Sequence, residues 1–254
     1  MSAERIRGVV QKAWKSTSAA FVLSCVAGLV DAVGYIQLYH LFMGFMSGNS
    51  IVMGLSLGLG HWTRAFLHMI PIFWFLVGVG FGTQLMAIAA TRGIRSPTGL
   101  MLSIEAALIC AYLLSVHHLL PLVGLPKNWN GIWGLVLLAA FLAIAMGIQT
   151  ATLHRAGGHS IHTTFITGVL TRFTGQTLSA VRKSGAGKEA EGLLSVEKSL
   201  WLALTYILYV LGAVTGAWGL ANWGVVVLFA AVGILLAAVV LDLLNPLPAS
   251  MQVF

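Results

Sequence analysis

The stretch from Gly28 to Gly60 reads GLVDAVGYIQLYHLFMGFMSGNSIVMGLSLGLG, and it decides the fold. It begins as an apolar span that carries one aspartate, Asp31, and it is interrupted at Tyr39-His40. It restarts at Ser47-Gly48-Asn49 with a second apolar run. Such an interruption leaves backbone groups without helical partners, which a bilayer tolerates only where the break is buried in protein or lines a cavity. The stretch therefore predicts a membrane helix followed by a broken, re-entrant segment over 40–60.

A similar interruption returns later in the chain, between Gly147 and Thr177, where the sequence is GIQTATLHRAGGHSIHTTFITGVLTRFTGQT. We expect a second broken segment over 154–181. Broken spans in corresponding positions of two halves are the sequence pattern that points to a solute site in a transporter.

The composition places the chain in a membrane. Hydrophobic residues make up 58% of it and charged residues 8%, whereas soluble domains carry about 25% charged residues. The net charge of +7 comes from short segments between apolar spans. It reflects orientation in the lipid bilayer, and we exclude nucleic acid as a partner on that ground.

We expect an all-α integral membrane protein with six transmembrane helices, at 18–39, 65–90, 99–120, 131–151, 200–220 and 224–244. Residues 1–17 form a basic leader, and the hydrophilic stretch 182–198 is expected to be a cytoplasmic loop. The two halves of the chain, 18–124 and 125–254, then hold three spans each.

Charge favours this topology over one in which both broken segments cross. With six spans and both termini in the cytoplasm, only Arg64 and Lys127 lie outside, as the positive-inside rule requires. With eight spans, Arg92, Arg95 and Arg155 also move outside. We therefore expect a multi-pass protein of the bacterial inner membrane. The basic residues expected inside are Arg5, Arg7, Lys12, Lys15, Arg92, Arg95, Arg155, Arg172, Arg182, Lys183, Lys188 and Lys198.

Three spans per half is an odd number, so the halves must face opposite ways as a 3+3 inverted repeat. Small residues at four-residue spacing let helix backbones approach closely, and the same glycine faces allow a homodimer. The matches between the halves are Gly28 and Asp31 with Gly147 and Thr150, Phe45 to Gly48 with Phe165 to Gly168, and Gly78 and Gly82 with Gly212 and Gly216.

These blocks resemble the YoaK family of bacterial multi-span membrane proteins. The first block of that family reads Gly-x-x-Asp-Ala-x-Gly-Tyr and then Phe-Met-Thr-Gly-Asn. The second reads Met-Gly-x-Gln-Asn-Ala, then Gly-Gly, then Thr-Thr-x-x-Thr-Gly-x-Leu-Thr. The matching residues here are Gly28, Asp31, Ala32, Gly34, Tyr35, Phe45, Met46, Gly48, Asn49, Met146, Gly147, Gln149, Ala151, Gly157, Gly158, Thr163, Thr164, Thr167, Gly168, Leu170 and Thr171.

The resemblance implies a multi-span inner-membrane protein and supplies no established activity. The chain departs from the pattern with Ser47 in place of Thr, Thr150 in place of Asn, and Tyr39-His40 where small residues are usual. Two of these departures fall in the expected site, which suggests a different solute.

The candidate site is centred on Asp31, because a carboxylate at that depth costs several kcal/mol unless it is paired or hydrated. Either it is a protonatable or cation-coordinating group, or it is a packing device bonded to nearby backbone or to Gln149. Helix starts at 47–49 and 163–168 offer N–H groups to an anion or are simply capped. The remaining candidate substrate-binding residues are Tyr35, His40, Ser47, Gly48, Asn49, Thr150, Thr163, Thr164, Thr167, Gly168 and Arg172.

Other residues are expected to have ordinary roles. His154, His159 and His162 do not have a standard zinc spacing, so we expect no metal and no cofactor. Glu105 and Asp242 are expected near helix ends, solvated or paired with loop arginines.

Three functions remain open. The first is a transporter or channel for a small polar or anionic solute, with proton coupling through Asp31. The second is a non-transporting scaffold or sensor. The third is an intramembrane enzyme that uses Ser47 with a histidine. We expect no enzyme, because the chain has no nucleophile elbow and no zinc set.

Overall fold

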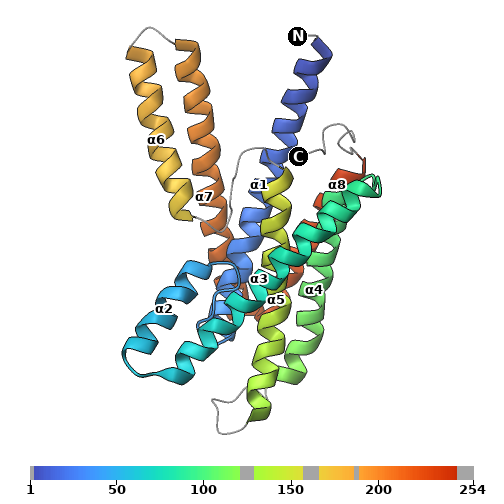
Figure 1. Ribbon diagram of the computed structural model, residues 1–254, viewed down its shortest axis with the longest axis vertical. Coiled ribbons are helices and arrows are strands. Elements are labelled where there is room, and N and C mark those ends of the chain that lie inside the picture. Colours follow the sequence, from blue (N-terminus) through green and yellow to red (C-terminus); the bar gives the residue numbers. More distant parts are fainter. Residues whose placement is uncertain (1–2, 121–128, 157–165, 186–188, 245–254) are drawn as a thin grey trace.

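The protein is all-helical in the computed structural model (Figure 1), which describes residues 3–120, 129–156, 166–185 and 189–244. Within these residues the order is α1 (Ala3–Gln37), α2 (Met46–Gly58), α3 (Trp62–Thr91), α4 (Pro97–Leu119), α5 (Trp129–Ala156), α6 (Ile166–Gly185), α7 (Glu189–Trp223), the short 3-10 helix η2 (Gly224–Val227) and α8 (Leu228–Leu244). The predicted fold class, a helical membrane protein, is confirmed.

Five segments are long and apolar enough to cross a membrane. Four of them lie in α1, α3, α4 and α5, and the fifth, Ser199–Leu244, covers α7, η2 and α8. The chain turns at Gly224, which has a φ of +68°. In Figure 1, α1, α4 and α7 run downwards, whereas α3, α5 and α8 run upwards.

Helix extends into two stretches that the sequence analysis did not assign to a span. The expected leader over 1–17 is mostly part of α1, which is continuous from Ala3 to Gln37. The expected loop over 182–198 contains the end of α6 and the first two turns of α7. Both stretches contain Glu, Lys, Arg and Ala, which are good helix formers.

The predicted break after α1 is present. Tyr39 and His40 have φ values of 52° and 62°, a left-handed conformation that is uncommon for residues other than glycine. The chain then runs without helix to Phe45. The break reverses the chain and allows α2 to start beside α1.

Helices α2 and α6 lie to one side of the other helices (Figure 1), with α2 running downwards from the middle of the molecule and α6 running upwards from it. Helix α2 has 13 residues and is therefore about 20 Å long, shorter than the roughly 30 Å hydrocarbon core of a bilayer. It packs on α3, and α6 packs on α7.

The closest helix crossings are those of α1 with α7 and of α3 with α5, and glycine makes both possible. A Cβ added at Gly28 of α1 would lie 2.9 Å from the backbone nitrogen of Ala213. A Cβ added at Gly147 of α5 would lie 2.8 Å from the backbone nitrogen of Val79. Distances this short leave no room for a side chain.

The two crossings have the same register. The α1 to α5 offset is 119 (147 minus 28), and the α3 to α7 offset is 134 (212 minus 78). With these offsets each contact in one crossing has a counterpart in the other. The matched contacts are Gly212 on Cys25 with Gly78 on Ile144, Gly216 on Leu29 and Ala32 with Gly82 on Ile148 and Ala151, and Gly28 on Tyr209 and Ala213 with Gly147 on Phe75 and Val79.

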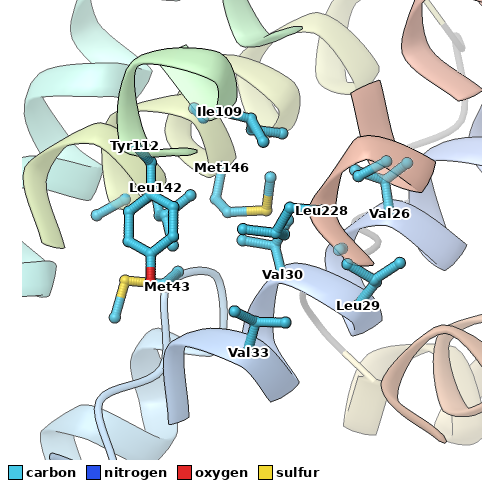
Figure 2. Close-up of a cluster of buried hydrophobic side chains, with 14 of the residues drawn as sticks. Val26, Leu29, Val30, Val33, Met43, Ile109, Tyr112, Leu142, Met146 and Leu228 are labelled. Atoms are coloured by element: carbon cyan, nitrogen blue, oxygen red, sulfur yellow. The ribbon is translucent and has the colours of Figure 1, made fainter. Parts of the chain in front are cut away.

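The buried apolar core is shared by both halves of the chain. Figure 2 shows Val30 of α1, Met43 of the break, Leu142 and Met146 of α5, and Leu228 of α8 converging on it. Helix α4 packs on α5 and α8. The core therefore combines residues from both halves of the chain.

The glycine crossings generate a stability prediction. Gly78→Ala should lower the free energy of unfolding by about 1–3 kcal/mol, the usual cost of overpacking, because its Cβ would lie 2.8 Å from the Cα of Ile144. Gly80→Ala is the matched control on the same helix, since nothing lies within 4 Å of a Cβ there. Thermal unfolding in detergent measures both, and equal midpoints would contradict the prediction.

Candidate functional site

The centre of the candidate site is the carboxylate of Asp31, which is 3% exposed. Its Oδ1 accepts hydrogen bonds from the backbone N–H groups of Met43 at 2.8 Å, Gly44 at 2.7 Å and Phe45 at 3.4 Å. Its Oδ2 accepts a hydrogen bond from the hydroxyl of Tyr209, on α7, at 2.9 Å. One side chain thus joins α1, the break before α2, and α7.

The bonds at Asp31 explain how the break is tolerated in a membrane. The first N–H groups of a helix have no partner within the helix, and Phe45, at the start of α2, provides no side-chain cap. Three successive N–H groups directed at one oxygen form an anion-binding concavity. Asp31 fills that concavity from a neighbouring helix and acts as its cap.

An anionic solute finds most of the N–H groups at this end of α2 already bonded. Those of residues 43–45 are bonded to Asp31, and those of Met46 and Gly48 are bonded to the carbonyls of Gly44 and Phe45. An anion would have to displace Asp31 from its position. Of the two alternatives for a partner of Asp31, nearby backbone binds it and Gln149 does not, since the amide nitrogen of Gln149 donates to the carbonyl of Leu23 at 2.9 Å.

Asn49 fixes the other side of the break. It is fully buried, its Oδ1 accepts from the N–H of Phe42 at 3.1 Å, and its Nδ2 donates to the carbonyl of Phe42 at 2.7 Å. The Nδ1 of His68, on α3, lies 3.2 Å from the same Oδ1. Because an amide oxygen only accepts, His68 Nδ1 carries a hydrogen. Asn49 therefore braces the break and does not cap α2.

Aromatic rings cover the outer side of the break. Tyr35 and His40 are exposed, and their rings meet edge to face at 4.8 Å between centroids. Tyr35 also lies 4.8 Å from Phe42, which contacts Phe45 at 5.2 Å. His40 is not among the residues that bond to Asp31, whose four donors are Met43, Gly44, Phe45 and Tyr209.

Two further residues of the predicted site, Ser47 and Gly48, lie in the first turn of α2. Gly48 is needed for packing, because an added Cβ would lie 2.6 Å from Cε1 of Phe45. Ser47 is exposed. His40 and His68 contact Tyr35 and Asn49, so the histidine contacts described here do not pair either ring with Ser47.

The second half contributes fewer described residues. Thr150, which the offset of 119 places opposite Asp31, donates its hydroxyl to the carbonyl of Met146 at 2.9 Å. Gly168 is half-buried and Arg172 is exposed on α6. Thr163, Thr164, His159 and His162, and the side chains of His154 and Thr167, lie outside the described residues. In the remainder, no three His, Cys, Asp or Glu side chains form a group that suits a metal ion.

Sequence reasoning missed two residues of this site. His68 lies alone in an apolar span, which is itself a signal, because an ionisable residue within a span usually has a function. Tyr209 gave no such signal in a single sequence. It reaches Asp31 because α1 packs on α7 across the glycine crossing.

Of the two acidic residues expected near helix ends, Asp242 lies near the end of α8 and Glu105 does not lie near a helix end. Asp242, on α8, has no arginine as its described partner and instead accepts from the hydroxyl of Ser96 and from the N–H of Gly99, at the start of α4. Glu105 is not near a helix end; it is 0% exposed in the middle of α4. The expected depth of Glu105 was too shallow, because α4 begins at Pro97 and Glu105 lies more than two turns inside it.

The hydrogen bonds at Asp31 generate a second prediction. Asp31→Ala should cost several kcal/mol of unfolding free energy, because each buried N–H group left without a partner costs about 1–3 kcal/mol. Tyr209→Phe should cost less, since it removes one donor and leaves the backbone donors satisfied. Tyr206→Phe, about one turn away on α7, serves as the control. Thermal unfolding of the purified protein in lipid gives the order, and a Tyr209→Phe loss larger than that of Asp31→Ala would contradict it.

Comparison with known proteins agrees with this description. No solved structure matches the chain. A curated relative, the UPF0700 transmembrane protein YoaK of Bacillus subtilis (strain 168), is 26% identical over 197 residues, which cover 76% of this chain and 79% of the relative. The family described as "Protein of unknown function (DUF1275)" matches residues 19–241. The resemblance found in the sequence is confirmed, and the chain is a multi-pass membrane protein that belongs to the DUF1275 family.

Proposed function

We propose that this protein is a secondary transporter for a small polar or anionic solute. Two inverted three-helix halves move relative to each other, and the half-helices α2 and α6 start near the middle of the membrane between them. The observation that carries the proposal is the shared register of the α1–α7 and α3–α5 crossings.

The register supports an inverted repeat in which α3 of the first half packs on α5 of the second half, and α7 of the second half packs on α1 of the first. With α1 matched to α5, α2 to α6, α3 to α7 and α4 to α8, the contacts of one half reappear in the other. Thus α1–α7 corresponds to α5–α3, α2–α3 to α6–α7, and α4–α5 to α8–α1. The members of each matched spanning pair run in opposite directions (Figure 1). Transporters with inverted repeats alternate between states by moving one such unit against another.

The break before α2 also supports transport. Irregular backbone within a bilayer is tolerated where it lines a cavity or is buried in protein. Here the break is braced by two polar residues, Asp31 and Asn49, and its exposed side carries Tyr35 and His40. A purely structural bundle has no need of this arrangement, because a continuous helix would satisfy the same backbone groups at lower cost.

Transport distinguishes this proposal from the scaffold alternative. We expect the purified protein in liposomes to exchange at least one member of a panel of amino acids, carboxylates, inorganic phosphate and sulfate. Asp31→Asn should slow that exchange by roughly tenfold, the equivalent of about 1.4 kcal/mol in the barrier, because the amide loosens the hold on α2. Protein-free liposomes are the control. Folded protein that moves none of these solutes would favour the scaffold.

We also propose that both termini are cytoplasmic and that α2 and α6 are re-entrant. A cysteine at Leu59, which is 71% exposed beside the turn at Gly60, should react with an impermeant maleimide added outside intact cells. A cysteine at Val181 of α6, which is 69% exposed, should react only after the membrane is opened. Both variants are made after Cys25 and Cys110 are replaced by serine. The reverse labelling pattern, or both positions on one side, would overturn this topology.

A further inference from the structure

The buried face of α4 holds a carboxyl group that no described residue satisfies. Glu105 is 0% exposed, and neither of its side-chain oxygens has a hydrogen-bond partner among the described residues. It lies in the middle of a continuous buried stripe of α4, whose other members are Met101, Leu102, Ala106, Ile109, Tyr112, Leu113 and Val116. Buried polar groups without partners are rare in native proteins, and each one calls for an explanation.

The described side chains of the helices around Glu105 offer it no counter-charge. Helix α4 packs on α5 and α8 and has a smaller contact with α3. Between Ile132 and Thr152, α5 has no titratable side chain, and the only acidic residue of α8 is Asp242, which is bonded to Ser96 and Gly99. On α3, His68 is bonded to Asn49, and Arg64 and Arg92 lie at opposite ends of the helix. On α4 itself the other titratable residues are Cys110, Tyr112, His117 and His118.

A single carboxyl group in an apolar interior suits a proton better than a metal cation. Hard metal cations require six or more oxygen ligands at short distance, and the described residues contain no cluster of acidic, histidine or cysteine side chains. A proton needs only one carboxyl oxygen. An ionised carboxylate in an apolar interior is far costlier than the neutral acid.

The position of Glu105 links it to movement between the halves. In the proposed repeat α4 belongs to the first half, whereas α5 and α8 belong to the second, so the group lies on the interface that must open and close. Tyr112 lies seven residues further on the same face of α4. Its ring is buried and its hydroxyl has no described partner. Figure 2 shows that hydroxyl directed towards Met43, the residue whose N–H is bonded to Asp31.

We propose that Glu105 is the proton-binding residue of this transporter, taking a proton when the α4–α5–α8 interface is closed and releasing it when relative movement of the halves admits water. The coupling of this proton to transport rests on the proposed function. Binding of the proton itself is a separate property, which is measurable without any solute. Asp31, with its four donors, then remains ionised and holds α2 throughout.

Infrared spectroscopy of the full-length protein in lipid at neutral pH tests the proposal. We expect the carbonyl band of a protonated carboxylic acid in the wild type, its loss in Glu105→Gln, and its retention in Asp31→Asn. Absence of the band from the wild type, or its persistence in Glu105→Gln, would overturn the assignment. This result does not depend on finding the solute, so a failed transport screen leaves it standing and counts against the proposed function alone.

A second variant keeps the test independent of folding defects. Glu105→Met replaces the group with an apolar side chain of similar length, and it should unfold at a temperature equal to or above that of the wild type, because it removes an unsatisfied buried group. A large fall in that temperature would mean that Glu105 is ionised and paired, which would overturn the proposal. In liposomes loaded with pyranine, solute-driven acidification should be lost in Glu105→Met and Glu105→Gln, whereas exchange of the same solute on both sides should continue.

Discussion

The fold depends on one constraint, which is that the chain breaks inside the membrane and the broken end must still satisfy its N–H groups. Water is absent there, so the acceptors for these N–H groups have to come from protein. The carboxylate of Asp31 accepts three hydrogen bonds from the N–H groups of residues 43–45 and a fourth from the hydroxyl of Tyr209. A shorter or neutral residue at this position would leave donors unpaired. The same four bonds set the position of α2 relative to α1 and α7.

The four bonds also explain why the glycine crossings matter. Asp31 reaches Tyr209 only because α1 and α7 approach closely, and that approach depends on Gly28, Gly212 and Gly216. A side chain at any of them would push the helices apart and lengthen the Asp31–Tyr209 bond. Packing and electrostatics are therefore coupled at this site, since the glycines allow α1 and α7 to approach closely and the carboxylate of Asp31 can then accept a hydrogen bond from Tyr209.

Much of the fold was readable from the sequence, because its strongest signals are local. Long apolar runs gave α3, α4 and α5 to within a few residues, with the exception of the ends of α5, and the polar break at Tyr39-His40 was placed correctly. Pairings between distant helices were harder. Nearby backbone and Gln149 were the alternatives for a partner of Asp31. Backbone N–H groups of residues 43–45 and the hydroxyl of Tyr209 bind it, and Tyr209 reaches it because α1 packs on α7. A single sequence carries no signal for the packing of α1 on α7.

The contrast between the two buried carboxyl groups follows from their surroundings. Asp31 faces four donors, each of which stabilises the ionised form by a charge-assisted hydrogen bond. Glu105 faces apolar side chains and no described donor. A group with four fixed bonds changes its protonation only if the helices that hold it separate, so it suits a structural role. A group with none changes its protonation as soon as water reaches it, and the interface between α4, α5 and α8 is where movement of the halves would let water in. One chain can therefore keep two acidic residues at depth for different purposes, with hydrogen-bond donors deciding which is which.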